Sequence, residues 1–144
     1  MDISVYDFER VMIVDDTKID RYIATYLMQK NNFARNILEF DLATKAIMFL
    51  EDNSNNQSVL PQVIVLDIRM PKMDGFQFLE KLALLPPSVR DFSCIIMVSS
   101  SLDASDHTRA GSNPVIKKFI NKPLCKANLE EIKSLYREMT FQDK

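Results

Sequence analysis

The chain has 144 residues and a nearly balanced charge, with 18 Lys and Arg residues against 20 Asp and Glu residues. This length fits one domain that buries a substantial core, and the balanced charge argues against the broad basic face that direct nucleic-acid binding requires. The apolar runs are far shorter than the roughly 20 residues that cross a bilayer, and no signal sequence follows Met1, so we expect a cytoplasmic protein with no membrane partner.

The first third of the chain predicts two strands and two helices. Continuous apolarity at 11–14 (VMIV) and a weaker run at 36–40 (NILEF) predict the strands. The segment after the first strand predicts a helix with one apolar face, which we expect to pack on a flat surface. That face consists of Ile19, Tyr22, Ile23, Tyr26 and Leu27, and the second helix carries Leu42, Ala46, Ile47 and Leu50.

The middle of the chain predicts two further strands with a helix between them. The apolar run at 63–66 (VIVL) ends directly in Asp67, and a second run lies at 94–98 (CIIMV). The periodicity of residues 78–82 predicts a helix that ends before Pro86, because proline cannot continue a helix.

The last third predicts a helix, a strand and a helix. Residues 104–110 form the weakest helical segment, because few of them are apolar. A fifth strand is predicted at 115–120 (VIKKFI), and Pro114 before it favours the edge of the sheet, where a missing backbone donor is tolerated. The final helix carries Leu129, Ile132, Leu135 and Met139.

Strands and helices thus alternate along the chain, which predicts an α/β fold. Continuous apolarity in the first, third and fourth strands indicates a parallel sheet that helices cover on both faces. We expect one domain over residues 1–144 with a core from about 10 to 139. Cys94 and Cys125 lack paired spacing and are interpreted as reduced packing residues.

Four of the predicted strands run into a residue type that carries chemistry. Asp15 and Asp16 follow the first strand, Asp67 the third, Ser99 the fourth and Lys122 the fifth. Ligands of an open parallel sheet bind beyond the carboxyl ends of its strands, so we expect one shared site. Clustered carboxylates repel each other unless a cation binds or one takes up a proton, which favours Mg²⁺ and a phosphoryl ligand. Asp67 is then the candidate nucleophile, and Lys122 and Ser99 would neutralise phosphoryl charge.

Four motifs carry a resemblance to a known family: IVDD at 13–16, VLDIRMPKMDG at 65–75, VSS at 98–100 and FINKPL at 119–124. Together they resemble the receiver domain of two-component response regulators, in family order and over nearly the whole chain. The resemblance implies a doubly wound, flavodoxin-like fold with five parallel strands in the order 2-1-3-4-5. It also implies a phosphorylation-dependent signalling switch, and not an enzyme that turns over a separate substrate.

The resemblance further implies how the acids act. Asp67 would accept a phosphoryl group from a histidine kinase or a histidine phosphotransfer protein. Mg²⁺ would be bound directly by Asp16, Asp67 and the backbone carbonyl of Arg69, with Asp15 assisting through water. Arg69 and Ser101 occupy positions that, in the family, tune the lifetime of the phosphate.

The switch residues are also implied by the resemblance. Ser99 would hydrogen-bond the phosphoryl group, Lys122 would pair with it, and Phe119 matches the aromatic switch position. Phosphorylation would reshape the face made by residues 104–110, the fifth strand and the last helix, for an unidentified downstream protein or a second copy of the chain. Two departures stand out, since Phe119 lacks the hydroxyl of the commoner Tyr and Ser99 replaces a frequent Thr.

Simpler interpretations of the same residues remain open at this point. Asp16 fits a cap of the first helix, and Asp67 fits a turn-forming acid. Lys122 fits an ordinary solvated lysine, as most lysines are. Ser99 fits a loop serine and Phe119 a core residue when each is judged alone.

Two other functions fit part of the pattern. A haloacid-dehalogenase-like hydrolase also forms an aspartyl phosphate, but Arg69 stands where its second acid is expected. A pseudo-receiver that only binds partners would lack an acid or the lysine, whereas all are present here. His107, the only histidine, is interpreted as a surface residue, so that phosphohistidine would come from a partner. The chain ends soon after the last predicted helix, and we therefore expect no DNA-binding or enzymatic output domain.

Overall fold

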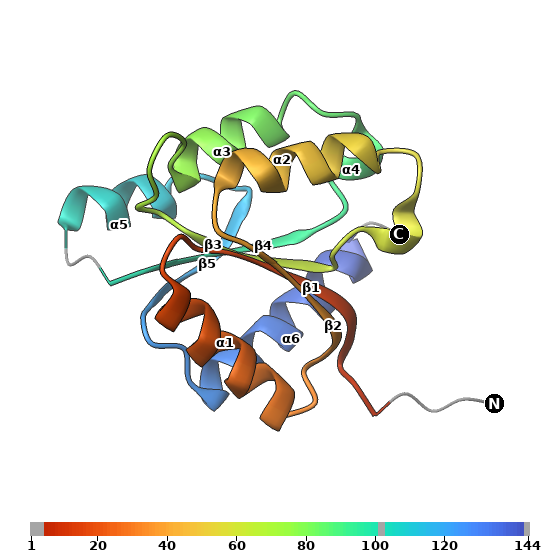
Figure 1. Ribbon diagram of the computed structural model, residues 1–144, viewed down its shortest axis with the longest axis vertical. Helices are drawn as coiled ribbons and strands as arrows, with labels where there is room; N and C mark the ends of the chain where they lie inside the picture. Colours follow the sequence, from red (N-terminus) through yellow and green to blue (C-terminus); the bar gives the residue numbers. More distant parts are fainter. Residues whose placement is uncertain (1–4, 101–102, 143–144) are drawn as a thin grey trace.

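A five-stranded parallel sheet lies between two groups of helices in the computed structural model, which describes residues 5–100 and 103–142 (Figure 1). The strands are arranged in the order β2-β1-β3-β4-β5, and every neighbouring pair is parallel. The predicted doubly wound α/β fold with the strand order 2-1-3-4-5 is therefore confirmed. Among the described residues, no helix is both long and apolar enough to cross a membrane.

All five predicted strands form. Every residue of the central strands β3 and β4 is buried, because helices cover both faces of the sheet and the two sequences are apolar throughout. Strand β5 is an edge strand and begins two residues after Pro114, as the proline indicated. The strands are β1 (Phe8–Val14), β2 (Ala34–Phe40), β3 (Val63–Asp67), β4 (Cys94–Ser99) and β5 (Ile116–Asn121).

The sheet divides the apolar core into two layers, and each layer is covered by a group of helices. Helices α1 and α6 lie on one face of the sheet, and α2, α3 and α4 lie on the other (Figure 1). Ala110 of α5 belongs to the same buried cluster as α2 and α3, at the β5 edge. The helices are α1 (Lys18–Lys30), α2 (Ala43–Asp52), α3 (Gly75–Leu82), α4 (Pro87–Arg90), α5 (Ala104–Gly111) and α6 (Lys126–Gln142), with a short 3₁₀ turn, η1 (Gln57–Val59).

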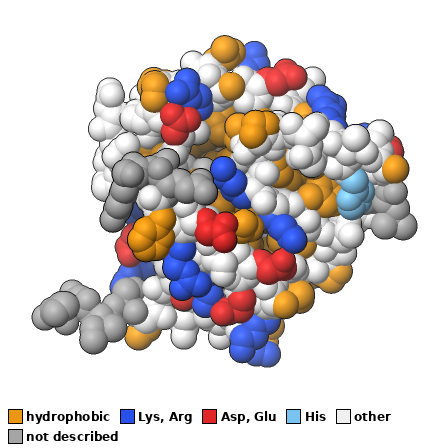
Figure 2. All heavy atoms as spheres, turned by 180° about the vertical axis from the view of Figure 1, so that it is seen from behind, with side chains coloured by type: hydrophobic (Ala, Val, Ile, Leu, Met, Phe, Trp, Pro, Cys, Tyr) orange, Lys and Arg blue, Asp and Glu red, His pale blue; other side chains and the backbone are white. Residues whose placement is uncertain are grey.

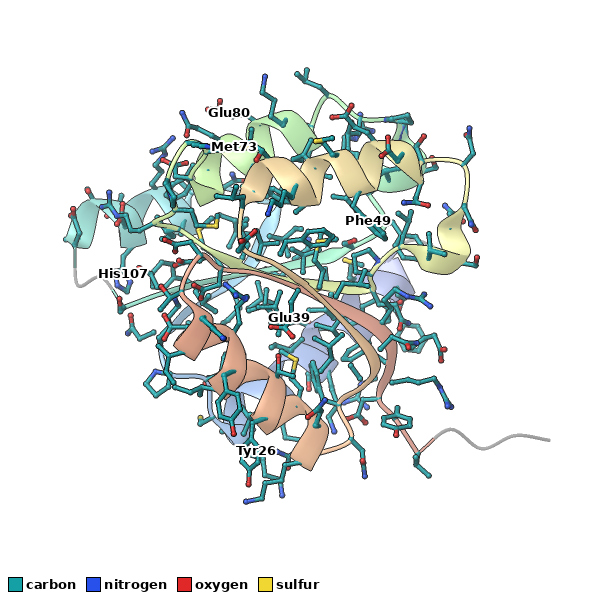
Figure 3. All side chains as sticks on the ribbon, in the orientation of Figure 1. Tyr26, Glu39, Phe49, Met73, Glu80 and His107 are labelled. Atoms are coloured by element: carbon teal, nitrogen blue, oxygen red, sulfur yellow. The ribbon has the colours of Figure 1, made fainter. Side chains whose placement is uncertain are left out.

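The apolar face predicted for α1 was wrong. The sheet contacts a different stripe of the helix, in which Ala24 and Met28 are buried and Leu27 is partly buried. The small side chain of Ala24 lets the helix backbone lie close to the sheet, whereas the prediction gave most weight to the largest apolar side chains. Figure 3 shows Tyr26 on the side of α1 that faces away from the sheet. The exposed members of the predicted face are Ile19 (60 %), Tyr22 (65 %), Ile23 (40 %) and Tyr26 (57 %).

The two cysteines differ in their surroundings. Cys94 is fully buried in β4, and burial raises the pKa of its thiol to about 11, so its interpretation as a reduced packing residue is confirmed. Cys125 is likewise a free cysteine, but its predicted packing role was wrong, because it is exposed just before α6. Its backbone N–H and its thiol donate to Asn128 Oδ1. Cys125 is exposed because the buried side of α6 begins only at Leu129.

The surface carries charges of both signs. Figure 2 shows Lys and Arg side chains interspersed with Asp and Glu on the face seen from behind. The described residues of that face therefore form no broad basic patch of the kind that follows a phosphate backbone.

Candidate functional site

The carboxyl ends of four neighbouring strands bring the predicted site residues to one edge of the sheet. Asp15 directly follows β1, Asp67 ends β3, Ser99 ends β4 and Lys122 directly follows β5. The strands β1, β3, β4 and β5 are neighbours in the sheet, so these ends lie side by side. The fold thus brings these residues together at one edge of the sheet, as the strand ends predicted.

Three carboxylates form the acidic part of this site. One oxygen from each of Asp15, Asp16 and Asp67 lies within 4.8 Å of the other two. Asp15 and Asp67 are only 3 % and 4 % exposed, whereas Asp16 is exposed. Hard oxygen ligands with one open side suit Mg²⁺, which usually keeps several waters. The donor set therefore fits the implied metal ion.

The electrostatics of Asp67 support the same assignment. Burial, followed by the negative charge of Asp15, raises the pKa of Asp67 to about 7, although Lys122 opposes the shift. One lysine thus does not compensate the buried carboxylates fully at neutral pH. A divalent cation would supply the missing positive charge.

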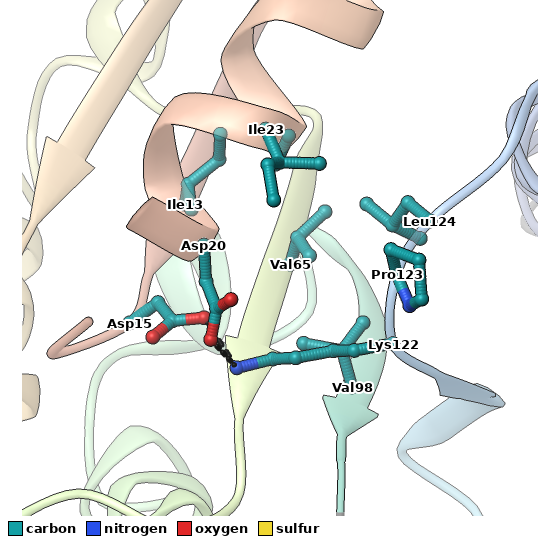
Figure 4. A pocket seen from close by; sticks show the side chains of 10 residues that line it. Ile13, Asp15, Asp20, Ile23, Val65, Val98, Lys122, Pro123 and Leu124 are labelled. Atoms are coloured by element: carbon teal, nitrogen blue, oxygen red, sulfur yellow. Dashed lines mark hydrogen bonds and ion pairs between the residues drawn. The ribbon is translucent and has the colours of Figure 1, made fainter. Parts of the chain in front are cut away.

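Lys122 reaches into the site from the β5–α6 loop toward Asp15 and Asp20 (Figure 4). With Asp67 included, its ammonium contacts three carboxylates. Its Nζ lies 2.7 Å from Asp15 Oδ2, 2.9 Å from Asp20 Oδ2 and 3.4 Å from Asp67 Oδ1. Burial alone would lower the pKa of Lys122, but the hydrogen bonds to Asp15 and Asp20 outweigh it and raise the pKa. The alternative of an ordinary solvated lysine is therefore wrong.

The β3–α3 loop fixes the backbone at Asp67. A Cβ atom on Gly75 would lie 2.6 Å from the Asp67 carbonyl oxygen, so only glycine allows this close approach. The N–H of Gly75 donates to the carbonyl of Ile68 at 2.8 Å. Asp74 caps α3 and exchanges hydrogen bonds with Gln77 in a capping box. Asp74 is thus the acid that ends this loop, and the side chain of Asp67 contacts Lys122 instead.

The start of α1 fixes Asp15. Its carboxylate Oδ1 accepts from the N–H of Thr17 at 3.0 Å, and its carbonyl accepts from Arg21 Nη1 at 2.8 Å. Thr17 is the N-cap residue of α1, and no side chain caps that position. The alternative in which Asp16 caps the helix is therefore wrong, and Asp16 remains exposed beside Asp15.

The switch candidates occupy β4 and β5. Ser99 is buried, and its carbonyl accepts from the N–H of Lys122 at 2.9 Å, which ties the ends of the two strands together. Phe119 is half-buried on β5, and its ring lies 4.2 Å from the ring of His107 on α5. His107 is exposed, as predicted (Figure 3). Ser101 lies outside the described residues.

Arg69 leaves the site and pairs with α5. Its side chain is 61 % exposed, and Nη2 lies 2.6 Å from Asp106 Oδ2 and 3.6 Å from Asp103 Oδ2. Asp106 is buried, so the pair joins the loop after β3 to the interior side of α5. The side chain of Arg69 is thus engaged by α5, while its backbone belongs to the loop beside Asp67.

Three residues of this arrangement were missed by sequence reasoning: Asp20, Arg21 and Asp106. Asp20 precedes the buried Ala24 and Met28 at intervals of four residues, so an acid on the inward stripe of α1 was the available signal. Asp106 had no comparable signal, because its partner Arg69 lies 37 positions away in the sequence. Arg21 donates to the backbone carbonyl of the nearby Asp15, and no pattern of side chains marks a backbone acceptor.

Comparisons with known proteins identify a family for most of the chain. The family model described as response regulator receiver domain matches residues 11–133. The chain is 26 % identical over 127 residues to the two-component response regulator ORR1 of Oryza sativa subsp. japonica, covering 87 % of this chain and 54 % of that protein. It is 35 % identical over 122 residues to protein-glutamate methylesterase/protein-glutamine glutaminase 1 of Dechloromonas aromatica (strain RCB). This match covers 79 % of this chain and 30 % of that protein. The chain thus spans about half, or less, of the length of these two relatives.

A solved structure is similar over nearly its whole length. The crystal structure of a response regulator receiver protein from Dyadobacter fermentans DSM 18053 superposes with a TM-score of 0.79 and 32 % sequence identity. The match covers 90 % of this chain and 98 % of that chain.

Proposed function

Because the chain belongs to the family of response regulator receiver domains, we propose that it is a phosphorylation-dependent signalling switch in which Asp67 accepts the phosphoryl group. The observation that carries the proposal is the meeting of Asp67 with two further carboxylates and the Lys122 ammonium at one edge of the sheet. A nucleophilic carboxylate, acids that fit a metal ion and a fixed cation are the groups that phosphoryl transfer to aspartate requires.

The donor in this proposal is a phosphohistidine of a histidine kinase or a phosphotransfer protein. A carboxylate oxygen of Asp67 attacks phosphorus in line, the new O–P bond forms as the N–P bond breaks, and the electron pair returns to the imidazole nitrogen. Only the ionised carboxylate attacks, and burial holds the pKa of Asp67 at about 7 without a metal ion. Lys122 favours the ionised form from 3.4 Å.

Mg²⁺ would be held by the carboxylates of Asp16 and Asp67 and by the backbone carbonyl of Arg69, with Asp15 acting through water. Bound Mg²⁺ supplies positive charge beside the transferring phosphoryl oxygens. Lys122 would pair with another of these oxygens, and the Ser99 hydroxyl would donate a hydrogen bond to the phosphoryl group.

The proposed output is a change at the α5, β5 and α6 face. Phe119 of β5 and Ser99 of β4 are the proposed switch residues, and the His107 ring on Phe119 links them to α5. Arg69 and Ser101 are proposed to set the lifetime of the aspartyl phosphate. An unidentified downstream protein, or a second copy of the chain, would bind the reshaped face.

The test is incubation with Mg²⁺ and a small phosphodonor, followed by intact mass and peptide mapping. The expected result is one phosphoryl group on Asp67, absent in Asp67→Asn and retained in Asp52→Asn, which removes an exposed acid at the end of α2. Beryllofluoride should perturb the backbone NMR signals around Asp67. A wild-type protein that gains no phosphoryl group, or an Asp67→Asn variant that still gains one, would contradict the proposal.

A further inference from the structure

One carboxylate in contact with Lys122 has no role in the proposed reaction. Asp20 lies in the first turn of α1, and its Oδ2 is 2.9 Å from Lys122 Nζ. This distance is shorter than the 3.4 Å that separates the same Nζ from Asp67 Oδ1. Figure 4 shows Lys122 extended across the pocket from the β5–α6 loop toward Asp20 and Asp15.

The position of Asp20 suits an interaction with the lysine and not with the metal ion. Among the described residues, the carboxylates close enough to share an ion are Asp15, Asp16 and Asp67, and Asp20 is outside that group. Its side chain is 31 % exposed, against 5 % for Asp15 and 6 % for Asp67. Asp20 therefore stands at the rim of the site, on the α1 side of the ammonium.

The helix holds Asp20 in place. Asp20 shares the inward stripe of α1 with Ala24 and Met28, whose burial fixes the helix against the sheet. A carboxylate in the first turn is also favoured by the partial positive charge at the N-terminus of a helix. Asp20 is thus a rigidly mounted partner for Lys122.

We propose that Asp20 is a positioning residue that holds the Lys122 ammonium toward α1 and competes for it with the phosphoryl group. This inference rests on the proposed function. An ammonium has three N–H donors, and three carboxylates lie within 3.4 Å of Lys122 Nζ. A phosphoryl oxygen on Asp67 must therefore share or displace one of these acceptors.

The charge of Asp20 works against the phosphorylated state. When Asp67 becomes an acyl phosphate, its own carboxylate charge is replaced by the larger negative charge of the phosphoryl group. The Asp20 carboxylate lies beside Lys122, so its negative charge repels the phosphoryl group and weakens the attraction between the lysine and that group. Asp20 thereby favours the unphosphorylated form and the release of phosphate.

The test compares Asp20→Asn with the wild-type protein. Asparagine keeps an oxygen that accepts from Lys122 and removes only the charge, which separates the electrostatic effect from the loss of a contact. We expect the affinity for beryllofluoride in saturating Mg²⁺ to rise about three- to tenfold, and the aspartyl phosphate to decay more slowly by a similar factor. Mg²⁺ affinity without beryllofluoride should stay within about twofold, since Asp20 is not in the metal-binding group.

Asp52→Asn is the matched control, because it removes one exposed carboxylate at the end of α2. It should leave both affinities unchanged. In metal-free protein, the NMR signals of the Lys122 side chain should shift in Asp20→Asn and not in Asp52→Asn.

Two results would overturn the inference while leaving the proposed function intact. The first is a wild-type protein that binds beryllofluoride and an Asp20→Asn variant that binds it no better. The second is an Asp20→Asn variant whose Mg²⁺ affinity falls tenfold or more, because Asp20 would then act on the metal ion. A wild-type protein that binds no beryllofluoride would instead overturn the proposed function, and this inference with it.

Discussion

Helices α1 and α5 border the same site, but different interactions hold them. Helix α1 buries Ala24 and Met28 against the sheet, whereas Ala110 is the one buried apolar side chain among the described residues of α5. Helix α5 is held mainly by a charge pair and two ring contacts. These contacts are Asp106 with Arg69, His107 with Phe119, and the Arg109 guanidinium 4.0 Å from the centre of the Phe76 ring.

The difference indicates which helix responds to chemistry at Asp67. Burial of apolar surface depends little on nearby charge, so α1 should keep its place when the site changes. The contacts of α5 involve Arg69, two residues after Asp67, and Phe119 on the strand that leads to Lys122. Elements with few buried apolar contacts open at the lowest cost in free energy. Helix α5 is therefore the element that a new charge in the site would move first.

The largest expected effect tests whether packing fixes α1. Met28→Ala removes a fully buried side chain from the contact with the sheet and should lower the free energy of unfolding by about 2–4 kcal/mol. Ile19→Ser, on the exposed side of the same helix, should change it by less than about 0.5 kcal/mol. Chemical denaturation of both variants gives the measurement. Equal losses would mean that the exposed face also contributes to holding α1.

The comparison also separates what the sequence could predict from what it could not. The fold followed from local signals. Buried parallel strands such as β3 and β4 consist almost entirely of apolar residues. Turns are marked by residue types that favour them, such as Asp74 and Gly75 before α3. The strand ends likewise predicted that Asp15, Asp67 and Lys122 would meet.

The side of a helix that faces the sheet was harder to predict. In α1 a small residue, Ala24, and not the largest apolar ones, marks the contact with the sheet. The pairs of Asp20 with Lys122 and of Asp106 with Arg69 join residues 102 and 37 positions apart. Such contacts depend on the assembled fold, and no local pattern in the sequence encodes them.

The next effect is the pH dependence of stability that Asp67, which lies in the site bordered by α1 and α5, should cause. Without metal, burial and Asp15 raise the pKa of Asp67 to about 7, against about 3.9 in an unfolded chain. Between these values the folded state binds more protons, so the free energy of unfolding should fall by about 3 kcal/mol as pH rises from about 4 to about 7. Thermal or chemical unfolding of metal-free protein across this range provides the measurement.

Two controls sharpen the pH experiment. Asp67→Asn should flatten this part of the pH profile, because asparagine does not titrate. Mg²⁺ at pH 7.5 should restore the stability of the wild-type protein, since a bound cation favours the ionised carboxylates. Hydrogen exchange at pH 7.5 without metal should be faster in α5 than in α1. A wild-type profile as flat as that of Asp67→Asn would contradict the assigned shift.

A smaller effect tests the charge pair that holds α5. Asp106→Asn removes the charge that faces Arg69 and should destabilise the protein by about 1 kcal/mol, because Arg69 is mostly exposed and water screens the pair. Hydrogen exchange should accelerate about fivefold in α5 and remain unchanged in α1. Asp91→Asn, which breaks an exposed pair with the adjacent Arg90, is the control and should change neither helix. Equal acceleration in α1 and α5 would mean that the pair supports the whole fold.

The smallest effect compares one ring contact on each helix. His107→Ala removes a ring 4.2 Å from Phe119 and should cost about 0.5 kcal/mol, at the lower end for aromatic pairs because His107 is exposed. The hydrogen-exchange rate of the backbone amides in α5 should then rise about twofold. Tyr22→Ala breaks the exposed stack with Tyr26, whose ring centres are 6.4 Å apart, and should leave exchange in α1 unchanged because the sheet contact holds that helix. If Tyr22→Ala loosens α1 as much as His107→Ala loosens α5, the two helices do not differ in what holds them.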